Sequence, residues 1–180
     1  MPQLFTTVKP YERSAIIEYI DSLRQLDMFS SAADDFNYEY LSNDSWEWSD
    51  AATSDSDRPF LKHLYRKKSD FYSVSTDDFD LHVSPVLYVG VGKDSRRDDM
   101  LFINSRGVEV RGMVDRKVGF YTYLTDNQAL LTSYVADRMR DVSVVPHEGF
   151  WKRYKEGEGV DFLQARGYIT FDATKSINVQ

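Results

Sequence analysis

The sequence contains no cysteine among its 180 residues. Disulfide bonds, thiolate metal sites and cysteine nucleophiles are therefore excluded. No stretch approaches the 18 or more consecutive apolar residues that a membrane-spanning helix needs, so we expect no membrane partner. The three histidines, His63, His82 and His147, stand far apart and form no H-x-x-x-H pair, so the sequence holds no recognisable histidine-based zinc motif.

Basic residues are absent from the segment that runs from residue 34 to residue 57. Eight acidic side chains lie in this segment: Asp34, Asp35, Glu39, Asp44, Glu47, Asp50, Asp55 and Asp57. The whole chain has a net charge of −7, so the remainder is close to neutral. Affinity for nucleic-acid phosphates comes from lysine and arginine, and we therefore expect no specific nucleic-acid binding. Such a segment favours a basic protein partner instead.

No motif in the sequence predicts a catalytic, metal or cofactor site. The run Gly90-Val91-Gly92-Lys93 lacks the spacing of a phosphate-binding loop, and Asp94 stands where such a loop needs Ser or Thr, so we predict a turn. Asp77, Asp78 and Asp80 lack the spacing, glycine and final glutamate of an EF-hand, which favours a solvated acidic loop. We therefore predict a protein that is not an enzyme and needs no cofactor. A site assembled from dispersed acids stays open, because such pairs are defined in space.

The first half of the chain combines one helical pattern with a long irregular segment. Ile16, Ile20 and Leu23 recur at helical spacing and predict a helix over residues 11–29, with Pro10 suited to its first turn. From residue 30 to residue 80, Ser, Asp and Asn alternate with aromatic residues. This composition predicts a long acidic, aromatic loop or insertion with short elements of its own, inside a single domain of residues 1–180.

The second half is rich in β-branched and aromatic residues, which favour strands. The dense apolar run within residues 83–91 predicts a strand buried on both faces. Residues 101–103 and 108–110 flank Asn104-Ser105-Arg106-Gly107, which predicts a hairpin turn.

A second short connection is expected at residues 115–117, followed by a strand over residues 118–124. Next comes a helix that Thr125 or Asp126 caps and that ends before Val142. The alternation of residues 168–172 predicts a last strand. Runs of strands without strict β–α alternation indicate an α+β fold. We expect a mixed, mainly antiparallel sheet with an N-terminal helix and one helix packed on the sheet.

Aromatic side chains are the candidates for subunit or partner contacts, because buried aromatic residues dominate the energetics of interfaces. The residues selected are Trp46, Trp48, Phe60, Tyr65, Trp151 and Tyr154. The last two alternate with Lys152, Arg153 and Lys155, a pattern that can also stack nucleic-acid bases. A role in the core or in a protein interface is favoured there.

The segment RKVGFYTYLTDNQALLTSYVADRMRDVSVVP, from Arg116 to Pro146, resembles the neck proteins of tailed bacteriophages, the tail-terminator and head–tail joining family. The similarity covers the second half of the chain and the first helix, and it lies in the order of elements. It implies a structural virion protein, assembled in the host cytoplasm, that forms a homo-oligomeric ring. Its other partners would be virion proteins of the connector and the tail. No catalytic or ligand residue comes with the resemblance.

Two other classes of function remain open. The acidic segment could imitate DNA phosphate, as in an inhibitor or binding module directed at a host nucleic-acid-binding protein, and the resulting complex would be sensitive to salt. An enzyme with a site built from dispersed acids would need a deep polar pocket. The assembly protein ranks first, the inhibitor second and the enzyme third.

Overall fold

The computed structural model describes residues 4, 7, 11–49, 54–154, 159–174 and 177–179. The chain divides into two compact units, Met1–Thr76 and Asp77–Gln180, and each is described by itself. The expectation of a single domain stays a prediction.

In the first unit, helix α1 (Arg13–Gln25) confirms the helical pattern of the sequence. The helix buries Ile20 of the predicted apolar stripe together with Ile17 beside it. It ends at Leu26, and Asp27 follows with a positive φ of 52°, which turns the chain away from the helix axis. Pro10 lies outside the described residues.

Helix α2 (Ala32–Asp44) was missed by the prediction of a long loop over residues 30–80. Its start is a capping box, in which the Ser31 hydroxyl accepts from the Asp34 N–H at 3.2 Å and the Asp34 carboxylate accepts from the Ser31 N–H at 3.0 Å. Phe36 and Tyr40 stack on each other but stay exposed. Because the helix buries little apolar surface, the periodic stripe that reveals most helices is absent from this segment.

The remainder of the segment matches the prediction of irregular chain with short elements. Isolated bridges join Asp55 to Lys67 and Phe60 to Leu64. Strand β1 (Tyr72–Ser75) is the only regular strand among the described residues of this unit.

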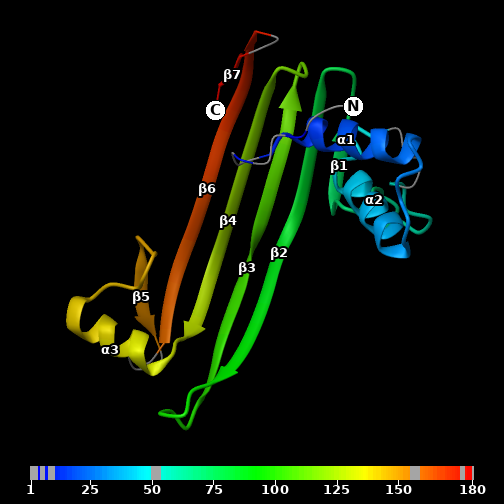
Figure 1. Ribbon diagram of the computed structural model, residues 1–180. Helices are drawn as coiled ribbons and strands as arrows, with labels where there is room; N and C mark the ends of the chain where they lie inside the picture. The colour runs from blue at the N-terminus through cyan, green and yellow to red at the C-terminus, as the bar shows by residue number, and fades with distance from the viewer. Residues whose placement is uncertain are drawn as a thin grey trace. The chain divides into compact units, whose positions relative to one another are not determined.

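The second unit is built on a six-stranded antiparallel sheet, which confirms the α+β fold class (Figure 1). Its elements are β2 (Phe79–Lys93), β3 (Met100–Val114), β4 (Val118–Leu130), α3 (Ser133–Val142), β5 (Trp151–Tyr154), β6 (Gly159–Thr174) and β7 (Ile177–Val179). The strands lie in the order β2-β3-β4-β6-β5, and β7 pairs with the far end of β6. Four long strands therefore form the body of the sheet.

Strand β3 corrects the prediction of a hairpin turn at Asn104-Ser105-Arg106-Gly107, because these residues pair continuously with both β2 and β4. Gly107 serves a close approach between strands. A Cβ atom at this position would lie 1.9 Å from the main-chain oxygen of Leu124. The real turn is the predicted connection at residues 115–117, where Asp115 and Arg116 have φ values of 52° and 50°.

Strand β4 extends six residues beyond the predicted 118–124, so the proposed caps Thr125 and Asp126 lie inside a strand. Thr125 is fully buried, and its hydroxyl accepts from the side-chain amide of Asn127 at 3.1 Å. Helix α3 begins only at Ser133. Residues 125–130 form a strand rather than a helix because they pair with β3 on one side and β6 on the other. Such pairing joins distant parts of the chain, so a local sequence pattern does not reveal it.

Helix α3 packs on the sheet, as predicted, and forms the core of the second unit. The buried cluster consists of Ala129, Met139, Val145, Val160 and Phe162. Ile103, Leu131, Val135 and Trp151 pack around it. The helix lies beside β5, at the end of the sheet where β4 ends and β6 begins (Figure 1), and packs there on the side chains of the cluster.

Candidate functional site

The two faces of the long sheet differ sharply in chemistry. Side chains alternate between the faces along each strand, and residues paired across strands share a face. By the observed register, face A holds the odd-numbered residues of β2 and β6 and the even-numbered residues of β3 and β4. Face B holds the alternate set and includes the core beneath α3.

Face A is apolar and exposed. Leu87, Val89 and Val91 of β2 have relative exposures of 78%, 73% and 71%, and Ile169 of β6 has 65%. The prediction that residues 83–91 are buried on both faces is therefore wrong. Other exposed apolar side chains of face A are Phe79, Met100, Val114, Val118, Leu124, Leu163 and Phe171.

Charged groups on face A are few. Arg106 and Asp126 lie opposite each other on neighbouring strands and form an ion pair at 3.3 Å. At the edge, Lys152 of β5 approaches Asp161 of β6 at 3.5 Å. These four groups offset one another, and Lys93 at the end of β2 adds one positive charge, so face A is apolar with a net charge of about +1.

Face B is polar and aromatic away from the helix. The rings of Tyr121 and Tyr168 stack with centroids 5.0 Å apart, and the Tyr121 hydroxyl donates to Glu109 at 3.3 Å. Burial, together with the neighbouring Glu109 carboxylate, raises the pKa of Tyr121 to about 12. Arg166 stands over the ring of Tyr123 at 6.0 Å. Such a face can remain in water.

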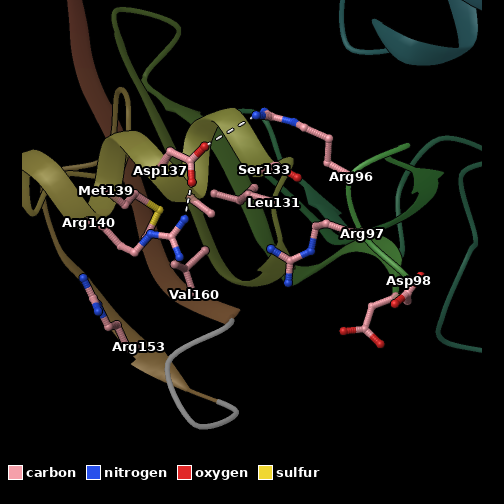
Figure 2. A pocket seen from close by; sticks show the side chains of 12 residues that line it. Arg96, Arg97, Asp98, Leu131, Ser133, Asp137, Met139, Arg140, Arg153 and Val160 are labelled. Carbon is pink, nitrogen blue, oxygen red and sulfur yellow. Dashed lines mark hydrogen bonds and ion pairs between the residues drawn. The ribbon is translucent and has the colours of Figure 1, made fainter.

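A cleft of about 600 Å³ lies beside α3, between the loop of residues 94–99 and strand β5 (Figure 2). Four arginines line it: Arg96 and Arg97 from the loop, Arg140 from α3 and Arg153 from β5. Leu131, Met139 and Val160 supply an apolar part of the wall. The sequence did not reveal this site, because its arginines come from three separate segments.

The loop that carries two of these arginines is held to α3 by Asp94. Its carboxylate accepts from the main-chain N–H of Arg96 at 2.9 Å and of Ser133 at 2.7 Å. These hydrogen bonds lower the pKa of Asp94 to about 2. On the helix, the Asp137 carboxylate pairs with Arg140 and also approaches Arg96 at 3.7 Å. The loop and the helix are therefore linked to each other at the rim of the cleft.

Of the predicted contact residues in the first unit, Trp46 is engaged within the unit. Its indole N–H donates to Asp70 at 2.6 Å, and the Lys67 ammonium lies 4.7 Å from the ring centroid. Trp48 is half-buried, whereas Phe60 is exposed.

Tyr65 is partly exposed and packs edge to face against Phe71, with ring centroids 5.5 Å apart. In the second unit, Trp151 and Tyr154 lie on β5 and are half-buried. Trp151 packs against the core cluster and carries the Arg153 guanidinium 5.9 Å from its ring centroid. A role of the six aromatic residues in contacts stays a prediction.

Half of the acidic segment is neutralised inside the first unit. Four of its eight acids form ion pairs there: Asp35 with Arg24, Asp44 with Arg13 at 2.6 Å, Asp55 with Lys67 at 2.6 Å and Glu39 with Lys68 at 3.5 Å. Asp50 lies outside the described residues. The electric field that this segment projects is therefore weaker than its sequence suggests.

Within the described residues, no group of three or more His, Asp or Glu side chains is arranged to hold a metal ion. No helix in the same residues is both long and apolar enough to cross a membrane. No protein-family model, curated protein or solved structure matches the chain.

Proposed function

We propose that this chain is a non-catalytic structural protein that assembles with further copies of itself through face A. On the resemblance to neck proteins, we propose that the assembly is a ring in the virion of a tailed phage, between the tail and the head connector. The observation that supports the proposal is the exposure of an apolar sheet face, with Leu87, Val89 and Val91 each more than two-thirds exposed.

The area of face A fits a stable contact between subunits. Strand β4 has 13 residues. At about 3.3 Å per residue and about 4.8 Å between strands, four such strands present roughly 800 Å². Stable protein–protein interfaces bury about 800 Å² on each partner. Exposed apolar patches of this size on monomeric proteins are rare and mark interaction sites.

The chemistry of face A favours a second copy as its occupant. Two apolar sheet faces pack about 10 Å apart with interdigitating side chains, so the face is complementary to itself. The Arg106–Asp126 pair supplies both charge signs, and a second copy offers the same two groups in return. A two-fold axis would give a closed dimer, whereas contact with a different surface of the next copy would give the ring.

The inhibitor alternative depends on uncompensated carboxylates, and no contact described above favours it. Four of the eight acids already have a cationic partner in the same unit. A basic target would have to compete with these pairs. We therefore do not carry this function further.

The test compares two substitutions on strand β2 that differ in the face they change. Val91→Glu places a carboxylate on face A, and Tyr88→Glu places one on face B, where Tyr88 is 57% exposed. Burying an unpaired charge in an apolar contact is costly, so Val91→Glu should weaken self-association by more than about tenfold, while Tyr88→Glu leaves it unchanged.

Size-exclusion chromatography with light scattering across protein concentration measures the association, and circular dichroism checks that both variants fold. Negative-stain images of the wild-type protein then separate a ring from a dimer. A wild-type monomer at all concentrations, or equal association in both variants, would sink the proposal.

A further inference from the structure

The arginine-lined cleft beside α3 lies on face B, so the proposed assembly through face A leaves it unused. Val160 and Arg153 belong to face B by the register of β5 and β6. The cleft brings arginines from the 94–99 loop, from α3 and from β5 to one place, which no local sequence pattern requires.

Positive charge exceeds negative charge on the helix side of the cleft. Asp137 is shared between Arg140 and Arg96, so one carboxylate serves two guanidinium groups. Arg153 adds a third guanidinium and contacts the ring of Trp151. Figure 2 shows Asp98 on the loop, away from Arg140 and Arg153. Asp99 also lines the cleft, so four arginines face three aspartates in all, and an anion that enters on the helix side meets guanidinium groups in excess of carboxylates.

The same cleft has an apolar lining. Met139 and Val160 belong to the buried core cluster, and Leu131 packs against it. The volume of about 600 Å³ falls within the range of about 300–1,000 Å³ that small-molecule sites occupy. Small-molecule sites typically combine such apolar walls with a few convergent polar groups.

We propose that this cleft binds a small amphipathic oxyanion, a carboxylate or phosphate group attached to an apolar or aromatic group. Arg140 and Arg153 donate hydrogen bonds to the oxyanion, because the planar guanidinium matches both carboxylate and phosphate oxygens. The apolar group lies against Leu131, Met139 and Val160. This proposal does not depend on how the chain assembles.

Four probes separate the two parts of the proposal in isothermal titration calorimetry on the wild-type protein at low salt. Phenyl phosphate and phenylacetate carry both features, inorganic phosphate carries only the anion, and benzyl alcohol has the ring without a charge. We expect at least one of the two amphipathic anions to bind about tenfold or more tightly than either single-feature probe. The tighter of the two identifies the oxyanion.

Substitution of the arginines localises the binding. Arg140→Gln and Arg153→Gln should each weaken the binding of the tighter amphipathic probe by about tenfold, in the range typical for loss of a charge-assisted hydrogen bond. Arg138→Gln is the matched control, because Arg138 lies exposed on the same helix and does not line the cleft. Circular dichroism confirms that each variant folds.

Three results would overturn the proposal. The first is that neither amphipathic anion binds. The second is that inorganic phosphate or benzyl alcohol binds as tightly as the better amphipathic probe. The third is that Arg138→Gln weakens binding as much as Arg140→Gln does, which would indicate a general effect of net charge.

Discussion

The carboxylate of Asp94 accepts a 2.7 Å hydrogen bond from the main-chain N–H of Ser133, so the loop after β2 caps helix α3. Thr132 occupies the N-cap position and makes no side-chain hydrogen bond there. A residue 39 positions away in the sequence thus supplies an acceptor for one of the N–H groups that the first turn of a helix leaves without a partner inside the helix.

The first prediction concerns the pH dependence of this cap. The pKa of Asp94 is lowered from 3.8 to about 2, so the ionised form stabilises the fold. Its contribution is fully present above pH 3.8 and is lost as the pH falls through about 2. We expect Asp94→Asn to be less stable than wild type at pH 7 and the difference to shrink towards pH 2, as measured by urea unfolding.

The control for the cap is Asp98→Asn in the same loop, which removes the same charge without removing an acceptor from α3. Its stability should follow that of wild type at both pH values. A resonance of the Asp94 carboxyl that titrates near 3.8 in carbon NMR would contradict the cap.

The second prediction concerns the close approach of β3 and β4 at Gly107. Gly107→Ala places a Cβ atom 1.9 Å from the Leu124 oxygen, so the strands must separate. We expect a loss of about 1–3 kcal/mol in the free energy of unfolding, the usual cost of overpacking. Gly92→Ala is the control, because its nearest neighbour is the Leu101 Cβ at 3.7 Å, an ordinary contact. Equal stability of the two variants would argue against the close approach.

The third prediction concerns the capping box of α2. Ser31→Ala removes the acceptor for the Asp34 N–H, and loss of an N-cap costs about 0.5–2 kcal/mol. We expect faster amide exchange in the first turn of α2 and unchanged exchange in α1. Ser14→Ala is the control, because the Ser14 hydroxyl donates to Glu12 at the start of α1, and its loss should leave amide exchange in α2 unchanged. An unaffected α2 in Ser31→Ala would show that the cap contributes nothing.

Local signals account for what the sequence predicted. Helix α1 carries an apolar stripe, and the turn at residues 115–117 lies between two β-rich runs. The capping box from Ser31 to Asp34 is also a local motif and indicates the start of a helix, but the many polar residues around it favour a loop. Its helix lacks the buried stripe that would have outweighed them.

What the sequence did not predict depends on distant parts of the chain. The apolar sequence from Val86 to Val91 would be the same for a strand that its own chain buries and for a strand that a second copy buries. The sequence pattern therefore could not predict that its side chains on face A are exposed. Asn104 to Gly107 has turn chemistry, yet two flanking strands keep it extended. The arginine cleft joins residues from 96 to 153, which only the fold brings together.

The last prediction concerns the outer edge of β6. Strand β5 pairs with residues 159–162 and β7 with Phe171 and beyond, so residues 164–170 pair only with β4 in the described chain. The N–H of Leu163 donates outward to Phe150, at 3.4 Å. Amides alternate in direction along a strand, so those of Ala165, Gly167 and Ile169 also point outward.

In a variant that does not assemble, such as Val91→Glu, these three amides should exchange with deuterium much faster than those of Gln164, Arg166 and Tyr168, which face β4. NMR that resolves each residue would show fast and slow amide exchange at alternate residues of β6. If the wild-type assembly also extends the sheet at this edge, the outward amides become protected there and the alternation disappears. Uniform protection already in the unassembled variant would contradict the open edge, because a strand with one neighbour cannot shield both sets of amides.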